Sequence, residues 1–290
     1  MRKIKFIINP AAGHGESKET LNLIHNRFQK EQIAYSISIS GYEGHIEKIA
    51  KEAVQEGYTD VVAVGGDGTV LEAFNGIFNS ETNLGIIPAG TGNDFVRMID
   101  IGNNFEKALE KVIEGQVKKV DIGLVNDTHF LNVVAMGIDG DIVNLTEKVK
   151  KFLKGSTAYI YSTFSSLLKY KCKNVLINID GLELKREVYL VAVGNGKYFG
   201  GGMMITPGAE IDSENFELVI INKMSKSKFA VLFRKVFSGN HVHEDVVEVL
   251  YGKKITIQSE EGLLINADGN IIGDSFANIQ ILPKAQNVII

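Results

Sequence analysis

The sequence predicts an N-terminal α/β domain with a parallel sheet, followed by a mostly antiparallel β-sandwich domain. Two patterns lead to this fold class. Through about the first 115 residues, short apolar strand patterns alternate with amphipathic helical stripes, which is typical of repeated βα units. From Val120 onward, strand patterns instead follow one another around hairpin turns. With 290 residues, 44% of them hydrophobic, the chain is long enough for one large or two modest domains.

In the first half, each strand pattern is followed by a helical one. The expected strands are Ile4–Ile8, Ile33–Ser40, 61–64 and 84–87. Ser17 is a candidate cap for the first helix, and an apolar stripe over 46–54 ends at Gly57. Further helices are expected over 70–78 and from an Asn104 cap to Gly115. This alternation predicts parallel strands joined by right-handed crossovers.

The second half contains mainly strand patterns. Strands are expected over 121–125, 130–135, 174–180, 182–193, 216–222, 254–258, 263–266 and 277–282, with one helix near 226–238. Asp180-Gly181 is a strong hairpin signal, and Asn126-Asp127 predicts another turn. A largely helical insert is expected over about 145–172.

One stretch combines a buried strand with a glycine-rich turn. The strand 61–64 runs directly into Gly65-Gly66-Asp67-Gly68-Thr69, and a helical pattern follows. Backbone amides in such a turn and at the helix N-terminus favour an anion such as phosphate. Asp67 repels phosphate unless a cation joins them or the carboxylate handles a proton. The alternative interpretation is an ordinary βα turn in which the aspartate caps a helix.

Two other loops repeat this arrangement. The strand Ile4–Ile8 ends in Asn9-Pro10-Ala11-Ala12-Gly13, and the strand 84–87 leads through Pro88 to Gly90-Thr91-Gly92-Asn93-Asp94. Because the carboxyl ends of parallel strands meet at one edge of a sheet, the three loops are expected to lie together, where open α/β sheets bind ligands.

These three motifs, in this order and spacing, resemble the diacylglycerol kinase catalytic superfamily. The resemblance is to its bacterial soluble lipid kinases of the diacylglycerol kinase and YegS-like type, and it covers essentially the whole chain. It implies an ATP-binding α/β kinase domain over residues 1–120, to which about 283–290 return, and a β-rich lipid-substrate domain over 121–282. The activity it implies is ATP-dependent transfer of the γ-phosphoryl group to a lipid hydroxyl, of diacylglycerol or a related lipid.

The resemblance also assigns nucleotide-binding residues. ATP is expected at Asn9, Pro10, Ala11, Ala12, Gly13, Ser40, Gly65, Gly66, Asp67, Gly68, Thr69, Thr91, Asn93 and Asp94. Asp67 is expected to hold Mg²⁺ or to take a proton. A structural Mg²⁺ is implied at Asp212, Ser213, Phe216 and Leu218. Relatives carry a second Asp and a Gly where this chain has Ser213 and Glu214, so a plain acidic turn is an equal alternative.

A second departure affects catalysis. Relatives usually have Asp-Gly-Glu where this chain has Asp268-Gly269-Asn270, and that glutamate is taken as the base. Asn270 is a neutral amide and does not accept a proton near neutral pH. Three outcomes are open: Asp67 takes the proton, Asp268 reaches the hydroxyl, or the protein turns over slowly and acts as a lipid- or nucleotide-binding regulator. An NAD- or sugar-type kinase of the wider group, which shares Gly-Gly-Asp-Gly, is the enzyme alternative.

The distribution of charge indicates a membrane partner. The net charge is −4, yet Lys148–Lys173 holds seven lysines, several aromatic residues and no Asp or Glu. Such a segment favours peripheral contact with an anionic lipid surface, although a helix with a solvated lysine face has the same composition. The sequence pI of about 5.9 and the absence of a nucleic-acid-binding motif argue against nucleic acid. A single cysteine, Cys172, fits a cytoplasmic protein, and a homodimer is left open.

Overall fold

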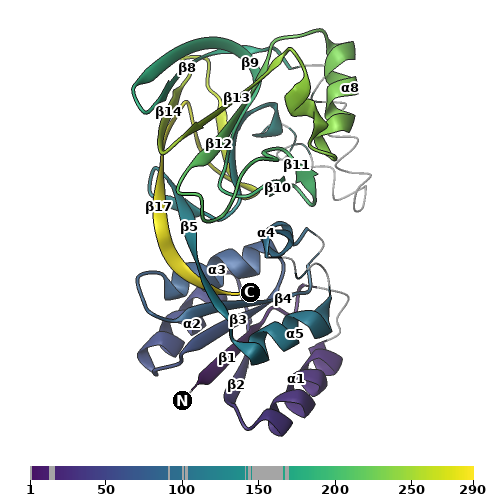
Figure 1. Ribbon diagram of the computed structural model, residues 1–290, viewed down its shortest axis with the longest axis vertical. Helices are drawn as coiled ribbons and strands as arrows, with labels where there is room; N and C mark the ends of the chain where they lie inside the picture. The colour runs from purple at the N-terminus through teal and green to yellow at the C-terminus, as the bar shows by residue number, and fades with distance from the viewer. Residues whose placement is uncertain are drawn as a thin grey trace. The chain divides into compact units, whose positions relative to one another are not determined.

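The chain folds into two compact units, shown in the computed structural model of Figure 1. The structure describes residues 2–12, 17–90, 92–99, 101, 104–140, 142, 145, 166 and 170–290. The first unit is Met1–Asp121 with Pro283–Ile290, and the second is Ile122–Leu282. The chain enters the second unit within β5 (Val117–Val125) and returns within β17 (Phe276–Ile289).

The first unit contains the predicted parallel sheet. Its strands are β1 (Lys3–Ile8), β2 (Ala34–Ile39), β3 (Asp60–Gly65) and β4 (Asn83–Pro88). They lie in the order β2-β1-β3-β4, all parallel, and the end of β17 pairs with β4 in parallel on the other side. Every residue of β3 is buried, as its β-branched run predicted. The register aligns the last residues of neighbouring strands, so their loops emerge at one edge.

Helices cover both faces of this sheet. They are α1 (Ser17–Glu31), α2 (His45–Gln55), α3 (Asp67–Ile77), the short α4 (Asp94–Met98) and α5 (Phe105–Glu114). The nearer pair, α1 with α5, and the more distant pair, α2 with α3, lie on opposite sides of the sheet (Figure 1). The predicted caps of α5 are confirmed, because the Asn104 side chain accepts a hydrogen bond from Lys107 N and Gly115 is left-handed at φ 66°.

A buried carboxylate ties the start of the chain to this sheet. Asp60 is fully buried, and its Oδ2 accepts hydrogen bonds from Arg2 Nε at 3.1 Å and Thr59 Oγ1 at 2.7 Å. Its Oδ1 accepts one from Asn83 Nδ2 at 2.9 Å. The Arg2 guanidinium also donates to the carbonyls of residues 112 and 113 in the last turn of α5. Asp60 therefore joins three strands and one helix end.

We expect Asp60→Ala to lower the free energy of unfolding by about 3 kcal/mol, because the change leaves buried donors without an acceptor. Urea unfolding followed by circular dichroism measures the effect. Asp127→Ala, in the exposed turn after β5, is the matched control and should change stability by less than about 0.5 kcal/mol. Equal stability of the two variants would contradict this role for Asp60.

The second unit is an antiparallel, sandwich-like β structure. Its strands are β6 (Thr128–Phe130), β7 (Val133–Gly137), β8 (Lys173–Ile179), β9 (Leu182–Gly194), β10 (Tyr198–Phe199), β11 (Met203–Met204), β12 (Phe216–Asn222), β13 (Val247–Gly252), β14 (Lys254–Gln258), β15 (Leu264–Ala267) and β16 (Asn270–Asp274). The main path runs β16-β15-β7-β9-β8-β14-β17, and β12 and β13 extend from β9. Among the described residues of this unit, the helix α8 (Lys226–Val236) and the 3₁₀ turn η1 (Asn240–His243) accompany these strands.

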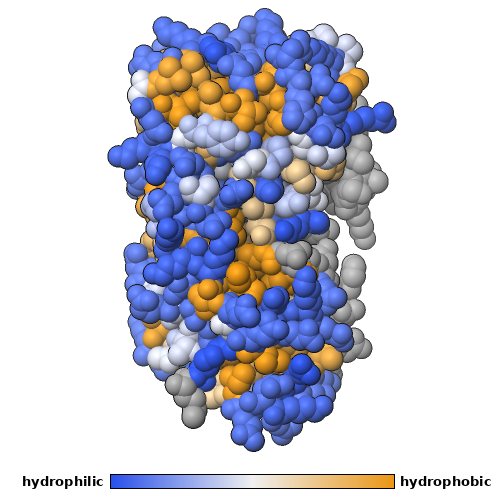
Figure 2. Space-filling view, in the orientation of Figure 1, coloured by the Kyte–Doolittle hydropathy of each residue, from blue (hydrophilic) through white to orange (hydrophobic). Residues whose placement is uncertain are grey.

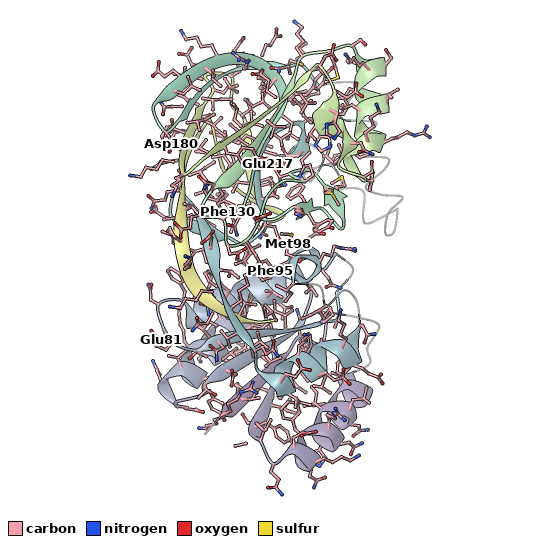
Figure 3. The ribbon with its side chains drawn as sticks, in the orientation of Figure 1. Glu81, Phe95, Met98, Phe130, Asp180 and Glu217 are labelled. Carbon is pink, nitrogen blue, oxygen red and sulfur yellow. The ribbon has the colours of Figure 1, made fainter. Side chains whose placement is uncertain are left out.

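The predicted hairpin at Asp180-Gly181 is confirmed. Both residues have positive φ, 49° and 97°, as a type I′ turn between β8 and β9 requires. The Asp180 carboxylate, labelled in Figure 3, also accepts hydrogen bonds from the amides of Lys253 and Lys254, each at 2.9 Å. The turn residue therefore joins β8 to the start of β14.

Some strand predictions need correction. The expected strand 130–135 is interrupted at Leu131 and Asn132, between β6 and β7. Strands β10, β11, β13 and β16 were not predicted, and β17 continues to Ile289 although its pattern suggested an end at 282. Lys284 lies within β17 with a positive φ of 49°.

The surface of the second unit is hydrophilic over α8 and apolar over the neighbouring strands (Figure 2). Helix α8 has no acidic residue and carries Lys226, Lys228, Arg234 and Lys235. Figure 2 shows hydrophilic side chains over α8 and apolar ones beside it, over β9 and β13. Within the described part of the chain, no helix has the length and apolar character needed to cross a membrane.

Candidate functional site

Asn9 joins the loop after β1 to the glycine-rich turn. Its backbone amide donates to the carbonyl of Val64 at 3.1 Å, and its Oδ1 accepts from Ala11 N at 3.0 Å, closing a tight turn. Its Nδ2 donates to Thr69 Oγ1 at 2.9 Å. The structure thus brings together two of the predicted motifs, and Asn9 holds the first turn of α3 in place.

Glycines bring the loops after β3 and β4 into direct backbone contact. A Cβ on Gly90 would lie 2.4 Å from the Cα of Gly66, and one on Gly65 would lie 2.3 Å from Thr69 Oγ1. The carbonyl of Gly65 also accepts a hydrogen bond from Ala89 N at 2.9 Å. No side chain fits at Gly65 or Gly90 without displacing these atoms, so these two glycines are needed for the fold of this rim.

Gly68 is different, because a Cβ there would meet no atom within 4 Å. It lies in the first turn of α3, and no side chain caps this helix. The first hydrogen bond of the helix runs from Val70 N to the Gly66 carbonyl at 3.1 Å. The backbone amides before Val70 therefore have no partner within the helix. Open space beside unpaired helix amides is the environment that a phosphate group needs.

Asp67 spans the two glycine-rich loops. Its Oδ1 accepts hydrogen bonds from Asp94 N at 2.7 Å and Phe95 N at 3.4 Å, so it caps α4, which Phe95 and Met98 mark in Figure 3. The aspartate does cap a helix, as the alternative interpretation held, but the helix belongs to the next βα unit. Within the described residues, Oδ2 of Asp67 makes no hydrogen bond. That oxygen is available to a cation or a proton.

The other predicted nucleotide residues have separate positions. Asn93 is buried and left-handed at φ 52°, and its amide group bonds both N and O of Gly90, which closes the loop after β4. Asp94 begins α4, and Ser40 follows β2, where its amide donates to the Ile8 carbonyl at 2.9 Å. Pro10, Ala11 and Ala12 lie in the Asn9 turn. The predictions for Gly13 and Thr91 lie outside the described residues.

In the second unit, Asp268 and Gly269 form the hairpin turn between β15 and β16, with φ of 46° and 91°. The Asp268 carboxylate accepts hydrogen bonds from the amides of Leu131, Asn132 and Val133 at 2.6, 3.0 and 2.9 Å. These bonds explain the break between β6 and β7. They favour a positioning role for Asp268, whereas Asn270, the first residue of β16, is exposed.

The turn at Asp212 carries the residues for which the resemblance implied a structural Mg²⁺. The Ser213 hydroxyl donates within the turn, to the carbonyls of Glu210 at 3.1 Å and Asn215 at 3.0 Å. Leu218 pairs with β9 on one side and β13 on the other, so its carbonyl belongs to the sheet. Glu214 is left-handed at φ 58°, the conformation that favours the glycine of relatives. The structural Mg²⁺ implied at Asp212, Ser213, Phe216 and Leu218 stays a prediction.

Sequence reasoning missed Glu217, a buried carboxylate in the apolar strand β12, which is labelled in Figure 3. Glu217 accepts a hydrogen bond from Gly208 N at 2.7 Å, and burial raises the pKa of its carboxyl group. The available signal was a single acidic residue within the run Phe216–Asn222. Gly90 was named in the loop after the strand 84–87 but was not assigned to the nucleotide site.

The fold and these loops define a kinase. An open glycine, helix amides and one accessible carboxylate oxygen at the rim of a parallel sheet suit a transferable phosphoryl group. The family model of the diacylglycerol kinase catalytic domain matches residues 3–125, and that of the YegS C-terminal NAD kinase β-sandwich-like domain matches 132–290. The chain belongs to the diacylglycerol kinase family and is a lipid kinase.

Similar proteins cover nearly the whole chain. Diacylglycerol kinases of Staphylococcus aureus strains RF122 and MRSA252 are each 31% identical over 285 residues, which is 98% of this chain and 90% of theirs. A crystal structure assigned as a diacylglycerol kinase of Bacillus anthracis strain Sterne is 26% identical, with a TM-score of 0.85 over 99% of this chain and 95% of that one. A second structure from that organism has 26% identity and a TM-score of 0.82.

Proposed function

We propose that this protein transfers the γ-phosphoryl group of ATP to the hydroxyl of diacylglycerol or a closely related lipid. The observation that carries the proposal is the Asp67 arrangement, in which one carboxylate oxygen is fixed by α4 and the other remains available beside Gly68. Residues 1–120 with about 283–290 are proposed to bind ATP, and residues 121–282 to bind the lipid. The names of the S. aureus relatives support diacylglycerol as the acceptor.

Each residue of the rim has a proposed role. The first amides of α3 and the Thr69 hydroxyl bind phosphate oxygens, with Gly68 leaving room for their approach. Asn9 orients Thr69 through their hydrogen bond. Asp67 is proposed to hold Mg²⁺ or to accept the hydroxyl proton, and its single accessible oxygen fits either role. Mg²⁺, when bound, supplies charge neutralisation for the phosphoryl group in transfer. A structural Mg²⁺ at the Asp212 turn stays a separate prediction.

Position 270, where this chain has asparagine in place of glutamate, allows a second test of the proposed kinase activity. We expect Asn270→Glu to raise kcat by about 10²-fold, because a carboxylate there adds general-base catalysis. Asn270 is exposed, so the substitution should leave stability unchanged. Transfer of labelled γ-phosphate to diacylglycerol in mixed micelles measures the rate. Asn278→Glu, in β17, is the matched control. An unchanged rate would show that proton removal from the hydroxyl does not limit this enzyme.

The same assay separates the remaining functions. Labelled phosphate on diacylglycerol supports the proposal, and labelling of NAD or a sugar instead would favour the wider kinase group. If no acceptor in a broad lipid panel is labelled while the protein still binds ATP, a nucleotide- or lipid-binding regulator is the better description. That last outcome would contradict the proposed catalytic activity.

We further propose a cytoplasmic protein of phospholipid biosynthesis that contacts the membrane surface through Lys148–Lys173. Most of that segment lies outside the described residues. At its end, Tyr170 is buried and stacks on Tyr189 with ring centroids 5.9 Å apart, and Lys173 Nζ donates to the Gly262 carbonyl. A homodimer stays a prediction. Sedimentation with vesicles containing anionic lipid tests the membrane contact, which should weaken as salt screens the lysines.

A further inference from the structure

An exposed aromatic side chain lies on the loop after β2, and neither the proposed phosphate contacts nor the acceptor chemistry uses it. Tyr42 is 61% exposed, unusually so for a tyrosine in a folded loop. Its ring nevertheless lies flat against the His45 ring, with centroids 4.4 Å apart and an interplanar angle of 8°. The two rings form one stacked aromatic surface.

The loop holds this pair in a fixed orientation. His45 Nδ1 accepts a hydrogen bond from Gly41 N at 3.0 Å, and His45 N donates to the Tyr42 carbonyl at 3.2 Å. Gly44 is left-handed at φ 78° and caps α2, which begins at His45. The aromatic surface is therefore set by backbone contacts before any ligand arrives, which lowers the entropy lost on binding.

The position of the loop connects it to the phosphate site. Strand β2 lies at the edge of the first unit's sheet beside β1 (Figure 1), and Ser40 N donates to the Ile8 carbonyl next to Asn9. Asn9 in turn bonds Thr69 at the start of α3. From β2 to β3 is two strand spacings, about 10 Å, a span that a ribose and its phosphates can bridge. One loop follows each of the strands β1, β2, β3 and β4 at this edge of the sheet. Among the described residues of these four loops, Tyr42 is the one exposed aromatic side chain.

We propose that Tyr42 is the base-binding residue of the nucleotide site, with the purine ring of ATP stacked on its face and His45 behind it. This inference rests on the proposed function, because it needs the phosphates at α3. Every nucleobase has a π-face, so the stack gives affinity with little choice among bases. Tyr42 thereby positions the nucleotide, and the residues at α3 act on its phosphates.

The test compares two probes, ADP and inorganic tripolyphosphate, by calorimetric titration. Tyr42→Ala should weaken ADP binding roughly 5- to 100-fold, the loss typical of one base–aromatic stack, and leave tripolyphosphate binding unchanged. Tyr42→Phe keeps the stacked ring and should bind both probes as the wild type does. Phe237→Ala, at an equally exposed aromatic residue of the second unit, is the control. In the kinase assay, Tyr42→Ala should raise KM for ATP without lowering kcat.

A spectroscopic arm reports the stack directly. The chain has no tryptophan, so Tyr42→Trp introduces a single indole fluorophore at the site. ADP should quench its fluorescence, and tripolyphosphate should not. Equal ADP affinity of wild type and Tyr42→Ala, or equal quenching by both probes, would overturn the inference while leaving the proposed function intact. If the wild type binds neither probe, the proposed function fails and this inference fails with it.

Discussion

Asp67→Asn should lower kcat for phosphoryl transfer by about 10²–10⁴-fold. The amide oxygen can still accept the hydrogen bonds from the amides of Asp94 and Phe95, so the cap of α4 persists. What is lost is the negative charge at Oδ2, which both proposed roles of Asp67 require. The free energy of unfolding should fall by about 1 kcal/mol or less, the contribution of a charge at a helix N-terminus. Steady-state rates and urea unfolding measure the two effects.

Asp127→Asn is the control for this experiment, because it makes the same chemical change in an exposed turn. Its rate and stability should match those of the wild type. If Asp67→Asn retained more than about a tenth of the wild-type rate, the result would contradict both the general-base and the metal-binding role of Asp67, because the usual rate contribution of such a group is larger. A large loss of stability without a loss of rate per folded molecule would leave Asp67 as a cap of α4 alone.

Two glycine substitutions three residues apart should have opposite effects. Gly68→Ala should stabilise the protein by about 0.5–1 kcal/mol, because alanine favours a helix over glycine and its Cβ meets open space. The same methyl group occupies the proposed phosphate position, so kcat/KM for ATP should fall by about 10²-fold. Gly65→Ala should instead destabilise the protein by about 1–3 kcal/mol or more, because its Cβ would overlap Thr69.

Thermal unfolding and nucleotide titration separate these effects, and each variant is the other's control. The expected result is a more stable Gly68→Ala protein that binds ATP poorly. Normal ATP affinity in that variant would place the phosphates elsewhere and remove the main support for the proposed site. A Gly65→Ala protein as stable as the wild type would contradict the close contact between Gly65 and Thr69.

Local signals predicted the elements whose structure depends on neighbouring residues. The buried run before Gly65, the Asn104 cap with Gly115, and the Asp180-Gly181 turn were all correct because short-range sterics and hydrogen bonds determine them. For the same reason, the Asp-Gly pair at 268 was a visible hairpin signal. The resemblance drew attention to its chemistry, and the turn itself was not predicted.

Side-chain roles that depend on distant partners could not be predicted. Leu131 and Asn132 break a strand because Asp268, more than 130 positions later, binds their amides. The contact between Gly66 and Gly90 exists only once two βα units pack together. Nor did the sequence show which helix Asp67 would cap. In each case the local sequence shows which residue is present, but only the tertiary fold determines which residue it contacts.

The path of β17 has a consequence for biosynthesis. Its final residues pair with β4, and Val288 and Ile289 are almost completely buried in the first unit. A ribosome makes most of that unit before the second unit, but Pro283–Ile290 come after the whole second unit. The first unit therefore cannot complete its sheet until the second unit has been synthesised, and until then the nascent chain carries an uncovered β4 edge.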